Sequence, residues 1–224
     1  MDVMAPSLPN SILDMATAAI LSRGVRVFQG AHLAPTEAGH VSALLRLMAP
    51  PTGSLIADIG CGIGEVARLM KQERPDLDFV LINKNALQLS LAPPCFEQIL
   101  ADMHDIPMDD ARVDGAMFCY SLCHSDFRIA LREAARITQP GGFLFVYDYE
   151  RMRGIGGLFE TRLAARALPR VYMESMACDA GWLPEMWVAP EVDDTPFREA
   201  YGNDAEYDLI FRDLRACAWR MRRA

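Results

Sequence analysis

Long hydrophobic segments are absent from this sequence: although 51% of its 224 residues are apolar, no apolar run reaches eighteen residues. A helix that crosses a membrane needs about 20 consecutive apolar residues, so we expect no stable membrane insertion. The sequence also lacks an N-terminal basic region followed by an apolar one, which a secretory signal peptide would need. Both absences favour a cytoplasmic protein.

Positive charge is scarce in this chain. Its 22 Lys and Arg residues are outnumbered by 30 Asp and Glu residues, which gives a formal net charge of -8. A protein that binds nucleic acid needs a basic face that neutralises phosphates. The acidic balance therefore predicts no nucleic-acid partner and leaves a small molecule as the expected substrate, with a homodimer left open.

Clustered cysteines are absent as well. The six cysteines are scattered, and Cys119 with Cys123 lacks the second ligand pair of a structural zinc site. We therefore expect no bound metal, and a reducing compartment suits this cysteine usage.

Neither internal repeats nor a linker rich in proline and glycine divides the chain, and 224 residues are enough for one sizeable core. We expect a single domain over residues 1–224. Within it, residues 1–50 form an N-terminal helical cap, residues 51–150 the core and residues 151–224 the C-terminal part.

What is present is an alternation of short apolar runs with helical patterns. Apolar runs at residues 54–59, 79–82, 113–120 and 143–147 alternate with helical spacing at 65–73, 86–91 and 126–137, the last ended by Gln139-Pro140-Gly141-Gly142. This rhythm predicts an α/β fold with a doubly wound, mostly parallel sheet that is buried on both faces. Further helices are expected at 10–21 and 37–48, on either side of an irregular stretch at 23–35. The C-terminal part is expected to form helices at 172–179 and 195–213 and strands at 185–188 and 216–222.

A glycine-rich turn follows the first of these strands, in the segment Asp58-Ile59-Gly60-Cys61-Gly62-Ile63-Gly64. Glycine lets the backbone turn sharply and approach a ligand closely, and the N–H groups that begin the next helix face an anionic group. A side chain at Gly60 or Gly62 would fill the space of the ligand. Strand, turn and helix thus stand in the order that a nucleotide site requires.

Polar residues follow the next two strands. Asn83 ends the second apolar run, where doubly wound folds place the group that binds ribose hydroxyls. Asp102 follows a third run at 98–101, and Met103 beside it is positioned to flank an adenine ring. The order of these residues matches the order of the strands.

The glycine motif resembles the first motif of the class I S-adenosylmethionine-dependent methyltransferases, and the likeness runs from about residue 37 to residue 149. The resemblance implies a seven-stranded Rossmann-like methyltransferase fold, S-adenosylmethionine as cofactor, and a lid insert after strand five. It also implies that the turn holds the methionine part, Asn83 the ribose and Asp102 the adenine amino group. Most members have an acid where this chain has Asn83. The expected cofactor-binding residues are Asp58, Gly60, Cys61, Gly62, Gly64, Asn83, Lys84, Gln88, Asp102, Met103 and Tyr120.

A dinucleotide dehydrogenase is the weaker interpretation of the same turn. The turn begins Asp-Ile-Gly-Cys-Gly, without a glycine directly after the strand, and no acid ends the second strand.

Three short segments resemble the branch of sterol, cyclopropane-fatty-acid and prenyl-diphosphate C-methyltransferases: Asn83-Lys84-Asn85-Ala86-Leu87-Gln88, Leu122-Cys123-His124-Ser125 and Val146-Tyr147-Asp148-Tyr149. That resemblance implies methylation of an isoprenoid-type alkene, which leaves a carbocation that aromatic rings stabilise and a base deprotonates. The candidate rings belong to Tyr120, Tyr147, Tyr149 and Phe28. The candidate catalytic residues are Tyr120, His124, Asp148 and His32.

One departure from that branch leaves other functions open. Where those enzymes carry a Glu that stabilises the cation, this chain has Tyr120. N- or O-methylation of a small metabolite therefore remains an alternative, as does a catalytically silent cofactor-binding module. The arginines between residues 151 and 170 are consistent either with a grip on a diphosphate or carboxylate or with a solvated helix face.

Overall fold

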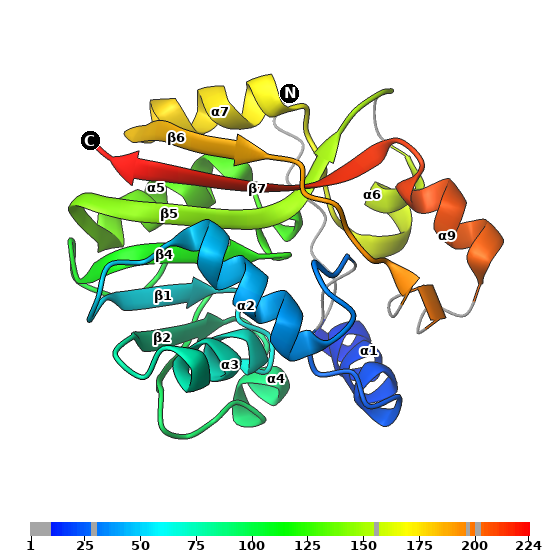
Figure 1. The fold of residues 1–224 in the computed structure, drawn as a ribbon, viewed down its shortest axis with the longest axis horizontal. Helices are drawn as coiled ribbons and strands as arrows, with labels where there is room; N and C mark the ends of the chain where they lie inside the picture. The colour runs from blue at the N-terminus through cyan, green and yellow to red at the C-terminus, as the bar shows by residue number, and fades with distance from the viewer. Residues whose placement is uncertain (1–9, 28–30, 155–156, 196–197, 200–202) are drawn as a thin grey trace.

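The computed structural model describes residues 10–27, 31–154, 157–195, 198–199 and 203–224. It contains a seven-stranded sheet with the order β3-β2-β1-β4-β5-β7-β6 (Figure 1). Only β7 runs antiparallel to its neighbours β5 and β6. The expected doubly wound, mostly parallel seven-stranded fold is confirmed. The strands are β1 (Leu55–Ile59), β2 (Asp78–Asn83), β3 (Glu97–Leu100), β4 (Val113–Cys119), β5 (Thr138–Arg151), β6 (Trp182–Val188) and β7 (Leu214–Arg223).

Helices cover both faces of the sheet. Helices α2 (Glu37–Met48) and α3 (Glu65–Glu73) pack on one face, and α5 (Phe127–Ile137) and α7 (Arg170–Asp179) pack on the other (Figure 1). Successive residues of one strand enter opposite cores, as Ile56 and Ala57 do in β1, and both are fully buried. Burial on both faces explains why these strands read as continuous apolar runs.

The remaining helices gather at the carboxyl end of the parallel strands. Figure 1 shows α1 (Asn10–Ser22), α6 (Leu158–Leu163) and α9 (Asp204–Phe211) at this edge. Helix α4 (Ala86–Ser90) and the short 3-10 helix η1 (Leu122–His124) follow β2 and β4 directly. The strand order reverses between β1 and β4, which is where doubly wound sheets open a ligand crevice.

Local capping sets several helix boundaries. Thr36 Oγ1 accepts a hydrogen bond from Gly39 N at the start of α2, and Asp126 accepts from Arg128 N and Ile129 N at the start of α5. Side-chain acceptors of this kind satisfy N–H groups that have no partner within the helix. The predicted bounds of α2 and α3 agree with the structure.

One prediction of secondary structure is wrong. The helix expected at 195–213 is interrupted, because Asn203 is extended (φ -143°, ψ 90°) and its side chain caps α9, which begins only at Asp204. The expected end of α5 before Gln139–Gly142 is confirmed, and β5 is longer than the apolar run at 143–147, since it begins at Thr138, which pairs with Val113, and continues to Arg151. Phe28 lies outside the described residues. No helix in the described part of the chain is long and apolar enough to cross a membrane.

Candidate active site

The glycine turn lies between β1 and α3 in a left-handed backbone conformation. Gly60, Gly62 and Gly64 have φ values of 77°, 56° and 70°, which residues with a side chain rarely adopt. A Cβ on Gly60 would come within 2.4 Å of Ser121 Cβ. A side chain at position 60 would therefore clash with Ser121 even without a bound ligand. Packing within the protein thus also requires glycine here.

A cavity of about 390 Å³ opens beside this turn, within the range of small-molecule sites. Its wall contains nine of the expected site residues: Gly60, Cys61, Gly62, Asn83, Lys84, Gln88, Met103, Tyr120 and His124. Asp58, Gly64, Asp102, Asp148 and His32 do not line it.

Asn83 uses its amide donors within the protein. Its Nδ2 donates to Gly62 O at 3.0 Å and to Gln88 Oε1 at 2.9 Å, and Gln88 Nε2 in turn donates to Thr17 Oγ1 of α1 at 2.8 Å. The amide oxygen accepts only a 3.4 Å contact from Asn85 N. Asn83 therefore offers a ribose hydroxyl an acceptor, and it connects the glycine turn to α1.

Asp58 lies at the end of β1, only 2% exposed, and its Oδ2 has no hydrogen-bond partner among the described residues. Burial raises the pKa of this carboxyl to about 7. Buried polar groups in proteins are nearly always paired. A carboxyl oxygen left without a donor next to the turn fits a ligand that brings an ammonium group or a bound water.

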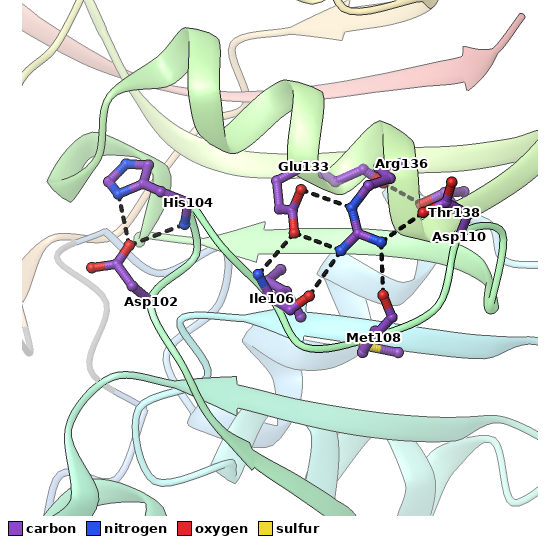
Figure 2. Close-up of polar contacts among 9 residues, drawn as sticks. Asp102, His104, Ile106, Met108, Asp110, Glu133, Arg136 and Thr138 are labelled. Atoms are coloured by element: carbon purple, nitrogen blue, oxygen red, sulfur yellow. Dashed lines mark hydrogen bonds and ion pairs between the residues drawn. The ribbon is translucent and has the colours of Figure 1, made fainter.

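Asp102 does not point into the cavity. Figure 2 shows its carboxylate against His104, with 2.6 Å between Oδ1 and Nδ1, and the Asp102 side chain is half exposed. His104 Nε2 accepts from Asp126 N at 2.9 Å, so the ring proton lies on Nδ1, the nitrogen that faces Asp102. Asp102 thus contacts the N-cap of α5 through His104, while Met103 lines the cavity, and the expected adenine role of Asp102 stays a prediction.

Asp148 also has a supporting position. It is 2% exposed, and its oxygens accept from Cys123 N at 2.9 Å and Tyr149 N at 2.8 Å. Burial raises its pKa to about 6. Asp148 holds the backbone of η1 and does not line the cavity, so it positions His124 and does not meet a substrate proton itself.

His124 lines the cavity at the end of η1. Its Nδ1 lies 3.1 Å from Ala164 O, and because a carbonyl oxygen only accepts, Nδ1 carries the proton. Burial lowers the pKa of His124, and the charge of Lys84 acts in the same direction. The ring is therefore neutral, with Nε2 as its proton-accepting nitrogen.

His32 lies outside the cavity wall, so this cavity gives no support to its expected role as a base. Its ring stacks on His40, with centroids 4.7 Å apart and planes 9° apart, and its backbone pairs with Asp193. Burial lowers the pKa of His32. The histidine pair belongs to the packing between the N-terminal segment and β5.

Aromatic rings line one end of the cavity. The Tyr120 ring lies 4.9 Å from that of Tyr149, and Tyr149 contacts Phe159 at 5.6 Å and Phe211 at 5.1 Å between centroids. Tyr120 has a φ of 55°, an unfavourable conformation for a residue with a large side chain, and such residues concentrate at functional sites. Tyr147, by contrast, is fully buried, and its hydroxyl donates to Ala31 O at 3.1 Å.

The arginines after β5 mostly have partners within the protein. Arg151 pairs with Glu160, and Arg170 lies 5.0 Å over the ring of Trp187. Arg162 lines the cavity and pairs with Glu206 at 3.1 Å.

The sequence did not point to several residues of the wall. These are Leu13, Thr17 and Ile20 of α1, the ion pair of Arg26 with Glu65, and the rings of Phe159 and Phe211. The three residues of α1 had only helical spacing as a signal, and Phe159 and Phe211 are separated from the motifs by tens of residues.

Comparison with known proteins decides the enzyme class. The model of a family described as "Hypothetical methyltransferase" matches residues 41–173, more than half of the chain. The chain belongs to this family. It is an S-adenosylmethionine-dependent methyltransferase with a class I fold, and the dehydrogenase alternative is wrong.

Curated relatives of this methyltransferase act on different kinds of molecule. It is 33% identical over 94 residues to the 25S rRNA (adenine(645)-N(1))-methyltransferase of Schizosaccharomyces pombe, covering 42% of this chain and 27% of that protein. It is 29% identical over 151 residues to the malonyl-acyl-carrier-protein O-methyltransferase of Yersinia pestis, covering 61% and 51%. The chain thus spans from about a quarter to a half of the length of these two relatives.

Solved structures share the whole fold at low identity. The cyclase SpnF superposes with a TM-score of 0.81 at 18% identity, covering 98% of both chains. Geranyl diphosphate C-methyltransferase from Streptomyces coelicolor A3(2) gives 0.78 at 14% identity, covering 98% of this chain and all of that one. At these identities the likeness concerns the fold alone.

The wall of the cavity fits the cofactor of the family. The turn offers close backbone approach and Asn83 offers an acceptor. Asp58 lies outside this wall, beside the turn, and has an unpaired carboxyl oxygen. No group of three or more metal-ligating side chains occurs among the described residues.

Proposed function

We propose that this methyltransferase acts on a small, largely apolar acceptor, and that His124 removes a proton from the reacting atom. The neutral His124 ring on the cavity wall carries this proposal. When bound, S-adenosylmethionine supplies an electrophilic methyl group on its sulfonium sulfur. A hydroxyl or an activated carbon becomes nucleophilic as its proton leaves, and a neutral imidazole is a suitable acceptor near pH 7.

Two contacts support His124 in this role. Ala164 O accepts a hydrogen bond from the Nδ1–H group of His124 and so fixes the tautomer and the orientation of the ring. Asp148 holds Cys123 N and thereby the turn that carries His124. A base that is held in place in this way loses little freedom in the transition state.

The aromatic end of the cavity favours an apolar methyl acceptor. Its wall consists largely of the rings of Tyr120, Tyr149, Phe159 and Phe211, to which Leu163 and Ala165 add aliphatic surface. The net charge of -8 supports a small acceptor over RNA, although relatives include an rRNA methyltransferase. The similarity to O-methyltransferases supports an oxygen as the reacting atom.

Incubation of the enzyme with deuterated-methyl cofactor and a cell extract tests this proposal. We expect mass spectrometry to find the label in a small apolar molecule and not in RNA. With that acceptor, His124→Gln should slow single-turnover methyl transfer about 10²- to 10⁴-fold while leaving cofactor affinity nearly unchanged. Labelled RNA, or an unchanged rate in the variant, would contradict the proposal, and binding without any turnover would favour a silent module.

Methylation of an isoprenoid-type alkene is the second candidate, and the Tyr120 ring favours it. The ring stands where the C-methyltransferase branch has its Glu, and a ring face stabilises a nearby cation by on the order of 0.5–2 kcal/mol. For an alkene, Tyr120→Phe should retain most of the rate and Tyr120→Leu should lose about tenfold. For a hydroxyl acceptor that depends on the Tyr120 hydroxyl, the two variants should be equally slow.

A further inference from the structure

The cavity wall has an excess of positive charge, although the chain as a whole is acidic. Among the described residues that line it, Arg26, Lys84 and Arg162 are cations and Glu65 is the one carboxylate. The whole chain, by contrast, has a formal net charge of -8. A cleft lined mainly by charges of one sign concentrates ligands of the opposite sign. The wall therefore favours a ligand that carries a negative group.

The cofactor does not account for this excess. S-adenosylmethionine has two positive groups, its sulfonium and its ammonium, against one carboxylate, so it is itself a cation. Arg26 already pairs with Glu65, with 3.2 Å between Nε and Oε2. A negative group that would balance the remaining cations must therefore come from the methyl acceptor.

Arg162 is the cation that lies beside the aromatic end of the cavity. It belongs to α6, together with Phe159 and Leu163, and all three residues line the cavity. Residues three and four positions apart lie on one face of a helix, so Phe159, Arg162 and Leu163 form a single face. This face of α6 offers a ligand apolar surface and a positive charge side by side.

The present partner of Arg162 leaves it able to bind a second anion. Arg162 Nε lies 3.1 Å from Glu206 Oε1 of α9, and the Arg162 side chain is 61% exposed. Ion pairs this exposed contribute little to stability, so a ligand can share or displace Glu206 at little cost. A guanidinium has five N–H donors, so one carboxylate does not exhaust it. Glu206 also accepts from Asn203 Nδ2 at 3.4 Å and keeps that contact if Arg162 turns to a ligand.

Other arginines after β5 do not offer the same possibility. Arg151 pairs with Glu160, and Arg170 lies over the ring of Trp187. Neither arginine lines the cavity. The sequence left open whether these arginines hold an anion or form a solvated face, and the cavity wall narrows the first possibility to Arg162.

We propose that the methyl acceptor is an amphiphilic carboxylate, whose apolar body lies against the aromatic end while Arg162 binds its carboxylate and so selects for it. The planar guanidinium fork matches a carboxylate with two parallel hydrogen bonds. The inference rests on the proposed function, because it takes the aromatic end as the acceptor site. The carboxylate is a recognition group, distinct from the reacting atom that His124 deprotonates.

Calorimetry on the full chain saturated with S-adenosylhomocysteine tests this inference with two probes that share one apolar body, hydrocinnamate and hydrocinnamyl alcohol. The wild type should bind the carboxylate about tenfold more tightly than the alcohol, and added salt should reduce this preference. In Arg162→Gln the preference should disappear while the affinity for the alcohol stays nearly unchanged. Arg162→Lys keeps the charge without the planar fork and should retain part of the preference.

Two controls separate ligand binding from a structural role. Glu206→Gln breaks the same ion pair but leaves Arg162 in place, so it should keep or increase the preference for the carboxylate. Arg170→Gln changes an arginine outside the cavity wall and should keep it unchanged.

Equal affinity of the wild type for the two probes, or no binding of the carboxylate, would overturn the inference. So would a Glu206→Gln variant that loses the preference as Arg162→Gln does, since the ion pair itself would then be what matters. These outcomes leave methyl transfer to an uncharged apolar acceptor intact. Failure of the proposed function has a different sign, an unchanged transfer rate in His124→Gln.

Discussion

Asn83 stands where the resemblance to class I methyltransferases leads us to expect an acid. In the structure its Nδ2 donates to Gly62 O at 3.0 Å, inside the glycine turn itself. An acid at this position has no proton to donate near pH 7. The amide is thus suited to this particular turn, even though it also offers the ribose an acceptor.

We therefore predict that Asn83→Asp, which restores the usual acid of the family, weakens cofactor binding. A carboxylate oxygen would face the carbonyl oxygen of Gly62, and Gln88 could rotate its amide whereas the backbone could not. The expected loss is about 1–3 kcal/mol, or roughly ten- to hundredfold in affinity. Titration with S-adenosylhomocysteine measures it.

Gln98→Glu is the control for this change. Gln98 Nε2 also donates to a backbone carbonyl, Pro93 O at 3.1 Å, but it lies outside the cavity wall. This variant should bind the cofactor as the wild type does. Equal or tighter binding by Asn83→Asp would show that the Gly62 contact does not matter.

At the scale of elements, helix α1 is attached to the cofactor side of the sheet by side chains. Thr17 Oγ1 accepts from Gln88 Nε2 at 2.8 Å, and Asp14 Oδ1 accepts from Asn85 Nδ2 at 2.8 Å. Leu13, Thr17 and Ile20 form part of the cavity wall. Because α1 forms part of this wall, we expect the two contacts to oppose release of a bound ligand.

We predict that Thr17→Val accelerates release of S-adenosylhomocysteine by about tenfold. Valine has the shape of threonine but cannot accept from Gln88, and one hydrogen bond contributes about 1 kcal/mol or somewhat more. Stopped-flow dissociation gives the rate. Ser22→Ala is the control, because Ser22 bonds only within α1, to Ala19 O. An unchanged rate for Thr17→Val would mean that α1 does not hold the ligand.

The loop after β3 is a second case in which an element determines the position of a residue. Arg136 of α5 donates to Ile106 O at 2.8 Å and to Met108 O at 2.7 Å, and Glu133 accepts from Ile106 N, as Figure 2 shows. These contacts fix the path of the loop. Together with the contact between Asp102 and His104, they hold the segment after β3 against the start of α5.

At the scale of the whole molecule, buried titratable groups predict how stability depends on pH. Burial, helped by the neighbouring His32, lowers the pKa of His40 to about 3, against about 6.5 in an unfolded chain. Between about pH 3 and pH 6.5, His40 binds a proton in the unfolded state but not in the folded state. His40 therefore stabilises the fold fully above pH 6.5, and its contribution is lost as the pH falls toward 3.

Two buried carboxyls act in the opposite direction over part of that range. Burial raises the pKa of Asp58 to about 7 and that of Asp148 to about 6, so the folded state takes up these protons before the unfolded chain does. Their effect favours the fold as the pH falls from about 7 to 4. In the pH dependence of the unfolding free energy, the effect of His40 and the effect of these two carboxyls therefore partly cancel.

We expect the contribution of His40 to appear as a difference in unfolding free energy between the wild type and His40→Asn. In His40→Asn the amide oxygen can still accept from Leu33 N, as His40 Nδ1 does at 2.9 Å. Below pH 6.5 the unfolding free energy of the wild type should fall relative to that of the variant by at most about 1.4 kcal/mol per pH unit. Urea unfolding at several pH values measures this difference. Parallel profiles would show that His40 is protonated in the folded state.

The sequence by itself determined the sheet, the glycine turn and hence the cofactor. These features depend on local patterns: apolar runs that are buried on both faces, and glycines in a backbone conformation that other residues avoid. For the same reason Gly60, Gly62, Asn83, Tyr120 and His124 could be expected at the carboxyl edge, and the structure places them on one cavity wall.

Only the tertiary structure decided which polar groups face the cavity and what closes it. The Asp148 carboxylate accepts a hydrogen bond from the backbone of η1, and the Asp102 carboxylate contacts His104. The contacts of α1 with the segment after β2 join residues 71 positions apart, and the rings of Phe159 and Phe211 meet Tyr149 from two separate helices. Such contacts arise when distant elements meet at one edge of the sheet, and no local pattern in the chain specifies them.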